Sequence, residues 1–97
     1  MGIVIDKKIN GTDETVVLNK YGKPQRESII KLAKGVKLHE YQSSLYSLYP
    51  MTEIDTIELK EFFWELKGDE KMVIWLHKKD SVWIAVDNLR WSKDIKF

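Results

Sequence analysis

The residues that could carry chemistry in this 97-residue chain are few. There are two histidines and no cysteine, so thiol chemistry is excluded. His39 begins the stretch HEYQS, which starts like a zinc-protease motif but lacks the second histidine that the motif needs. His77 lies in an apolar stretch, where a structural histidine is commoner than a base or a metal ligand. The histidines therefore predict no catalytic residue and no metal site.

The hydroxyl and carboxyl groups lead to the same prediction. Ser43 and Ser44 lie near His39 in sequence but lack the strained turn that exposes a nucleophilic serine. Glu58 and Glu61 are one helical turn apart, which is typical of a solvated helix face. The chain has no glycine-rich phosphate loop. The sequence predicts a protein that is not an enzyme and binds no cofactor.

The charge pattern and the tryptophans favour binding to another protein. Residues 53–70 carry seven acidic side chains against two lysines. Trp64 lies within this acidic segment, and acidic residues around an aromatic anchor suit a basic groove on a partner. The predicted partner-binding residues are Trp64, Trp83, Trp91, Glu58, Glu61 and Glu65.

A basic segment makes nucleic acid the alternative partner. Residues 20–39 carry six lysine or arginine side chains against one glutamate. Lysines would neutralise phosphates, and nearby tyrosines would stack on bases. Arginine dominates the reading of base edges but occurs only twice in the chain, so protein is the first choice of partner. The residues predicted for nucleic acid are Lys23, Arg26, Lys31, Lys34, Lys37 and Tyr41.

Two strands are predicted in the stretch MVIWLHKKDSVWIAV, residues 72–86. A turn centred on Lys79-Asp80 gives a hairpin in which His77 pairs with Val82 and both faces are apolar. Two apolar faces are typical of a central strand pair that is covered on both sides. The alternative is that a partner, or a second copy of the chain, covers one face. Trp75 and Trp83 lie on opposite faces, so we expect one in the core and the other at a contact surface.

The N-terminal half is predicted from turn and cap signals. Asn10-Gly11 is a strong turn signal, and a hairpin over residues 3–18 would be centred there. Residues 24–34 are predicted as a short helix, with a strand as the alternative. A further strand is expected over residues 36–41, followed by an aromatic connector over residues 43–50.

A second helix is predicted over residues 55–67. Asp55 can cap its start, and Gly68 follows its end. Ile57 and Trp64 fall on a second face, which indicates two neighbours. The apolar residues of the main face recur at helical spacing, namely Leu59, Phe62, Phe63 and Leu66.

These elements indicate one domain of the α+β class over residues 1–97. The expected architecture is a small antiparallel sheet built from two hairpins, with one or two helices packed on it. A small SH3-like β-barrel with one helix is the alternative, which is favoured if residues 26–32 form a strand.

Composition indicates the setting in which the chain acts. The chain is 43% hydrophobic and 32% charged, which is typical of a globular protein. It shows no signal-peptide pattern and no apolar run long enough to span a membrane, so a cytoplasmic location is expected. The predicted function is a protein-binding module, an adaptor or inhibitor. The alternatives are a nucleic-acid-binding domain and a structural homo-oligomer such as a homodimer. Small, cysteine-free, lysine-rich chains are also common among phage and mobile-element proteins.

Overall fold

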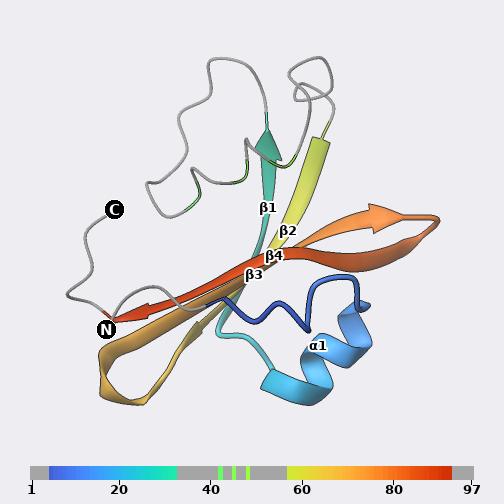
Figure 1. The fold of residues 1–97 in the computed structure, drawn as a ribbon. Coiled ribbons are helices and arrows are strands. Elements are labelled where there is room, and N and C mark those ends of the chain that lie inside the picture. The colour runs from blue at the N-terminus through green and yellow to red at the C-terminus, as the bar shows by residue number, and fades with distance from the viewer. Residues whose placement is uncertain (1–4, 33–41, 43–44, 46–47, 49–56, 93–97) are drawn as a thin grey trace.

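The computed structural model describes residues 5–32, 42, 45, 48 and 57–92. In this part of the chain α1 (Glu14–Tyr21) precedes the strands β1 (Arg26–Leu32), β2 (Ile57–Glu65), β3 (Glu70–Lys79) and β4 (Val82–Ser92), and the 3-10 turn η3 (Lys67–Asp69) links β2 to β3. The strands form one open antiparallel sheet in the order β1-β2-β3-β4, with α1 against one face (Figure 1). This is a small α+β fold, as predicted. The described strands do not close into the SH3-like barrel.

β2 replaces the helix predicted over residues 55–67, so that prediction is wrong. β2 pairs with β1 on one side and with β3 on the other. Both of its faces are buried, and a strand buried on both faces carries apolar residues at consecutive positions, as in Phe62-Phe63-Trp64. Such a run also satisfies helical spacing. Aromatic and β-branched side chains favour the strand, because each packs against a neighbouring strand on its own face.

α1 occupies part of the segment for which a hairpin over residues 3–18 is predicted, so that prediction is also wrong. The carboxylate of Asp13 caps the helix by accepting a hydrogen bond from the Val16 amide at 3.0 Å. Gly22 ends the helix with a φ of 82°, a conformation that favours glycine. These two caps outweigh the strand propensity of the valines between them.

Residues 5–13 are held against the sheet by hydrogen bonds. Asn10-Gly11 does form part of a turn, with Gly11 at a φ of 90°. The Gly11 amide donates to the Ala85 carbonyl at 2.8 Å, so this segment lies along the outer edge of β4. The buried side chain of Asn88 accepts from the Asp6 amide at 2.8 Å and donates to the Asp6 carbonyl at 2.9 Å. These contacts fix the point at which α1 begins.

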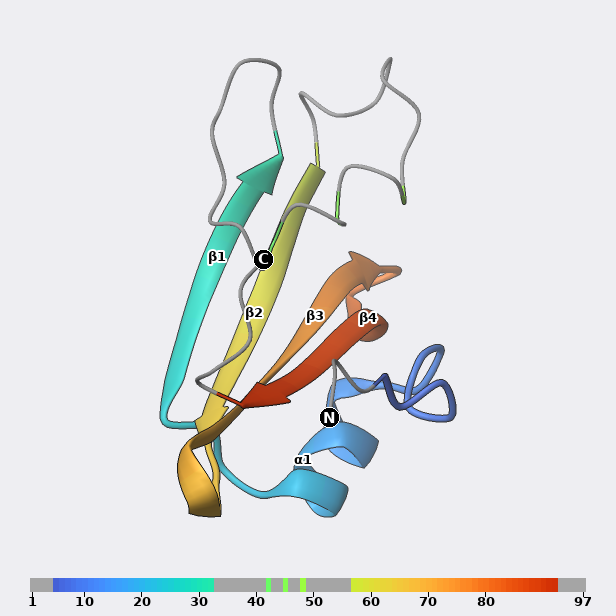
Figure 2. The ribbon, with the colours of Figure 1, turned by 60° about the vertical axis from the view of Figure 1, so that its left-hand side comes forward.

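β1 confirms the strand alternative for its segment, and the helix predicted over residues 24–34 is wrong. The β-branched residues Ile29 and Ile30 favour this conformation. β1 lies at one edge of the sheet and pairs with β2 over its whole length (Figure 2). The strand predicted over residues 36–41 and most of the connector over residues 43–50 lie outside the described residues.

The stretch MVIWLHKKDSVWIAV contributes to an antiparallel pair, β3 and β4. Its turn is centred on Asp80-Ser81, so the predicted centre at Lys79-Asp80 is wrong by one residue. Asp80 and Ser81 have φ values of 51° and 69°, which is the geometry of a tight two-residue turn. His77 consequently pairs with Ile84. A β-bulge at Val86 shifts the register by one residue further along β4.

Two apolar cores lie on opposite faces of the sheet. The face that α1 covers, here called the helix face, has a core of Ile9, Val17, Phe62, Trp64, Met72, Ile74, Leu76 and Ala85. The core on the opposite face contains Leu32, Leu45, Ile57, Leu59, Phe63, Val73, Trp75, Leu89 and Trp91. Both faces of the β3–β4 pair are therefore covered within the chain, and α1 covers one of them in place of the helix predicted over residues 55–67.

Candidate functional site

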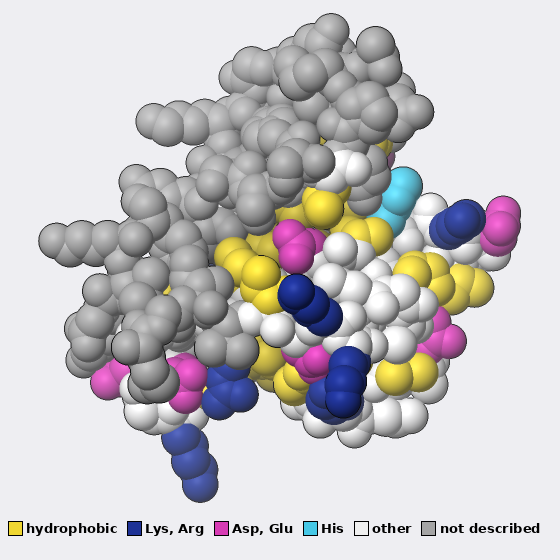
Figure 3. Space-filling view, viewed as in Figure 1, with side chains coloured by type: hydrophobic (Ala, Val, Ile, Leu, Met, Phe, Trp, Pro, Cys, Tyr) yellow, Lys and Arg dark blue, Asp and Glu magenta, His cyan; other side chains and the backbone are white. Residues whose placement is uncertain are grey.

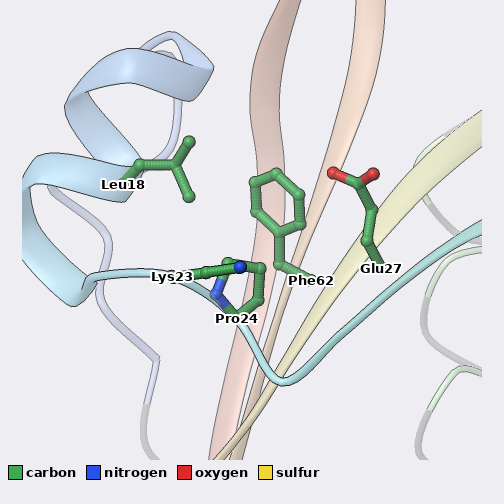
Figure 4. Close-up of a pocket in the computed structure, with 5 residues that line it drawn as sticks. All are labelled: Leu18, Lys23, Pro24, Glu27 and Phe62. Atoms are coloured by element: carbon green, nitrogen blue, oxygen red, sulfur yellow. The ribbon is translucent and has the colours of Figure 1, made fainter.

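A surface hollow of about 360 Å³ opens between α1 and β1 on the helix face. Leu18 of α1, Pro24 of the connector and Phe62 of β2 give it an apolar lining, and Lys23 and Glu27 complete its walls (Figure 4). We call this hollow the α1–β1 groove. An apolar hollow with one cation and one anion can hold an apolar side chain and orient polar groups beside it.

The connector between α1 and β1 is fixed from both ends, which gives the groove its shape. The indole Nε1 of Trp64 donates to the Gly22 carbonyl at 3.3 Å, where α1 ends. The Gln25 amide donates to the Phe63 carbonyl at 2.9 Å, just before β1 begins. Pro24 lies between these two anchors and restricts the backbone further. The groove is therefore preformed.

Lys60 of β2 links α1 to β1 on the helix face. Its Nζ lies 2.6 Å from the Glu14 carboxylate and 3.9 Å from the Glu27 carboxylate. The same nitrogen lies 4.6 Å from the centre of the Trp83 ring. The Lys60 side chain is mostly buried, so solvent screens its closer ion pair less than an exposed pair. Glu27 makes only the longer contact, and its side chain is 55% exposed.

Asp6 forms a polar cluster with the last turn of α1. Its carboxylate accepts from the Lys20 ammonium at 2.6 Å and from the Tyr21 hydroxyl at 2.5 Å. The hydrogen bonds from Lys20 and then Tyr21 lower the pKa of Asp6 to about 2. The hydrogen bond to Asp6 raises the pKa of Lys20. The pKa of Tyr21 is also raised, mainly by burial and secondly by the hydrogen bond to the Asp6 carboxylate. This cluster joins the N-terminal segment to the end of the helix.

The three tryptophans predicted to bind a partner lie at different places in the fold. Trp64 is 5% exposed in the core of the helix face, and Trp91 is 7% exposed in the core of the opposite face. Trp83 is half-buried next to Lys60. Trp75 is fully buried and belongs to the core. Trp83 is therefore the most accessible of the four tryptophans.

The three glutamates predicted to bind a partner do not form one stripe. Side chains alternate along a strand, so Glu58 projects to the helix face while Glu61 and Glu65 project to the opposite face. Glu58 and Glu65 are exposed. Glu61 is buried, and its Oε1 accepts hydrogen bonds from the side-chain Nε2 of Gln42 at 2.8 Å and from the indole Nε1 of Trp75 at 2.9 Å. Glu61 thus organises a core. The predicted helix with an acidic surface around Trp64 is absent, because these residues belong to β2.

The basic residues predicted for nucleic acid divide between the two faces of β1. Lys31 lies across from Glu58 on the helix face, and the Arg26 guanidinium lies 4.2 Å from the centre of the Phe63 ring on the opposite face. Lys23 borders the α1–β1 groove. Basic, acidic and apolar side chains are interspersed over the described part of the face in Figure 3. The remaining residues of this prediction lie outside the described part of the chain, namely Lys34, Lys37 and Tyr41.

Sequence reasoning missed four of the five residues that line the groove: Leu18, Pro24, Glu27 and Phe62. A local signal exists for the helix wall, because Asp13 and Gly22 are typical of the two ends of a helix. That helix would carry Leu18 and would end just before Pro24. The other wall depends on the pairing of Glu27 with Phe62 across β1 and β2, which no local pattern indicates.

Comparisons of the chain with protein-family models, with curated proteins and with solved structures found no match. Within the described residues, no helix combines the length and apolar character needed to cross a membrane. In the same part of the chain, no three His, Cys, Asp or Glu side chains gather into a metal-binding group. Function is therefore inferred from the geometry of the groove.

Proposed function

We propose that this chain is a non-enzymatic protein-binding module, an adaptor or inhibitor in the cytoplasm, and that the α1–β1 groove holds its partner. The observation that carries the proposal is the apolar hollow bordered by Leu18, Pro24 and Phe62 on the surface of the helix face. Hollowed apolar surface bordered by a few charges is a feature of binding sites.

The charges beside the hollow define the chemistry of the segment that it would hold. An apolar side chain of the partner would pack against the half-buried Leu18 and Pro24, and an acidic neighbour would pair with the exposed Lys23. Rim charges steer the encounter and set the orientation, whereas the apolar side chain supplies most of the affinity. Trp83 supports a longer contact, because its half-buried ring lies next to Lys60, which also approaches Glu27.

Nucleic acid is the competing partner and would use Lys23 and Lys31, which share the helix face. Glu27 lies on the same face between them in sequence, and its exposed carboxylate would repel phosphates. Anisotropy of labelled oligonucleotides measured at two salt concentrations distinguishes this partner. Binding that weakens steeply with salt and is unchanged by Leu18→Asp would favour nucleic acid over the proposal.

The test of the proposal is selection of peptides from a displayed library, followed by affinity measurements on variants. Leu18→Asp places a charge in the hollow and is expected to weaken the selected peptides at least about tenfold. Lys23→Glu leaves the apolar lining intact and is expected to weaken peptides that contain an acidic residue. Val82→Asp changes an exposed apolar residue at the β3–β4 turn, so it is the matched control and should leave affinity unchanged.

Circular dichroism verifies that each variant keeps the fold. The proposal is supported if the selected peptides share an apolar residue next to aspartate or glutamate. These peptides should also bind Leu18→Asp more weakly than the wild type and bind Val82→Asp as tightly as the wild type. A library that yields no binder, or peptides that bind Leu18→Asp as well as the wild type, would overturn it.

A further inference from the structure

β1 is one of the two edge strands of the described sheet. Five of the seven residues of β1 are exposed, and Ile29 is 54% exposed, more than any other exposed large apolar residue in the described chain. Among the described residues, no strand pairs with this edge. An unpaired edge offers a row of backbone donors and acceptors to a further strand.

The other edge of the described sheet is protected. Residues 11–13 lie along β4, where the Gly11 amide donates to Ala85 and the Ala85 amide donates to Thr12, both at 2.8 Å. The bulge at Val86 interrupts the regular ladder of the same strand. Bulges and covering segments are devices that keep an edge from pairing with another chain. β1 has no bulge, and no described segment covers its outer edge.

We propose that β1 pairs antiparallel with β1 of a second copy of this chain, about a two-fold axis at Ile29. In this register each Glu27 lies directly opposite Lys31 of the other copy, and the two Ile29 side chains meet at the axis. All three residues project to the helix face, as their partners in β2 show. On its helix face β1 is thus complementary to itself in charge and in apolar character, whereas on the other face Arg26 lies opposite Leu32 and Ser28 opposite Ile30.

The contacts within one copy leave these side chains able to pair. Glu27 makes only the 3.9 Å contact to Lys60, whose closer partner is Glu14 at 2.6 Å. Lys31 is exposed on the same face. Other antiparallel registers that keep the two helix faces together do not place Glu27 opposite Lys31, so the charges select the register centred on Ile29.

The assembly joins the two four-stranded sheets into one continuous sheet. Because the two-fold axis is perpendicular to the sheet, both copies of α1 lie on the same side, and the two α1–β1 grooves flank the central pair of Ile29 side chains. This inference goes beyond the proposed function, since one groove could hold a partner without the second copy.

The test is sedimentation equilibrium of the chain and of charge variants over a wide range of concentration. The wild type is expected to dimerise. Glu27→Lys places lysine opposite lysine twice, and Lys31→Glu places glutamate opposite glutamate twice. Each substitution is expected to raise the dimer dissociation constant at least about tenfold. Val82→Asn, at an exposed position away from β1, is the control and should dimerise like the wild type.

Mixing the two single variants gives a sharper readout. A Glu27→Lys copy facing a Lys31→Glu copy restores both opposite-charge pairs, so the mixture should form a heterodimer although each variant alone is weakened. The double variant Glu27→Lys/Lys31→Glu should likewise regain self-association. A monomeric wild type at every concentration would overturn the proposal, and so would dimers that neither single variant weakens. Binding of peptides to the groove is measured separately, so failure of the dimer leaves the proposed function standing.

Discussion

Among the described residues, Asp6 has the carboxylate whose ionisation contributes most clearly to the fold. Its pKa falls from the ordinary value of 3.8 to about 2 because its carboxylate accepts hydrogen bonds from Lys20 and Tyr21. A carboxyl group with a lowered pKa in the folded state binds protons more readily after unfolding. Its stabilising contribution is therefore complete above the unfolded pKa and is lost as the pH falls towards 2.

We predict that Asp6→Asn lowers the free energy of unfolding at pH 5 and that its difference from the wild type shrinks between pH 4 and pH 2, because protonation removes the same interaction from the wild type. Urea unfolding at a series of pH values measures this. Glu65→Gln changes an exposed carboxylate and serves as the control. An Asp6→Asn difference that stays constant with pH would contradict the role assigned to the cluster.

At the scale of elements, the backbone geometry of the β3–β4 turn sets the register in which β3 pairs with β4. Asp80 and Ser81 both adopt positive φ, a region that glycine, asparagine and aspartate tolerate but that strains serine. The strands continue on either side of the turn in a regular ladder from Lys79 opposite Val82 to Leu76 opposite Ala85. The flanking pairs therefore hold Ser81 in a conformation that serine favours only weakly.

We predict that Asp80→Asn/Ser81→Gly stabilises the protein by about 0.5–1 kcal/mol, because this pair suits the turn and leaves the strand register unchanged. Ser81→Val is the matched opposite change and should destabilise the protein, since a β-branched side chain resists positive φ. Thermal and urea unfolding compare the two variants. Equal stability of the valine and glycine variants would show that the turn does not control the hairpin.

At the scale of the whole molecule, two cores share one sheet. Leu59 lies in the core of the opposite face and Leu76 in the core of the helix face, and both are fully buried in neighbouring strands. β2 and β3 contribute side chains to both cores. If either strand unfolds, both cores therefore lose their packing. The two faces should therefore unfold together.

We predict that Leu59→Ala and Leu76→Ala each lower the free energy of unfolding by about 2–5 kcal/mol, the usual cost of a cavity at a buried leucine. Tryptophan fluorescence and far-ultraviolet circular dichroism should report one coincident transition for both variants. Val16→Ala, at an exposed position on α1, is the control. A variant in which fluorescence and circular dichroism report different midpoints would show that one face unfolds on its own.

The sequence by itself determined the class of the fold and the character of its C-terminal half. Alternation of residues through MVIWLHKKDSVWIAV distributes apolar side chains over two faces, and a strand pair with two apolar faces must be covered on both. The predicted turn between the strands lies within one residue of the observed turn, and the turn preference of Asp80 and Ser81 favours the observed centre over one that includes Lys79. Asn10-Gly11 likewise marked a turn, but not the helix that follows it.

Only the tertiary structure decided which segments became strands and which side chains meet. The run Phe62-Phe63-Trp64 suits a helix or a strand, and its pairing with β1 and β3, distant in sequence, selects the strand. The strand conformation directs the side chain of Glu61 into the core of the opposite face. It also brings Phe62 beside Leu18 and Pro24 in the α1–β1 groove. Local propensity differs by fractions of a kcal/mol per residue, whereas burial of an aromatic side chain contributes about 1.5–3 kcal/mol, so contacts between distant segments prevail.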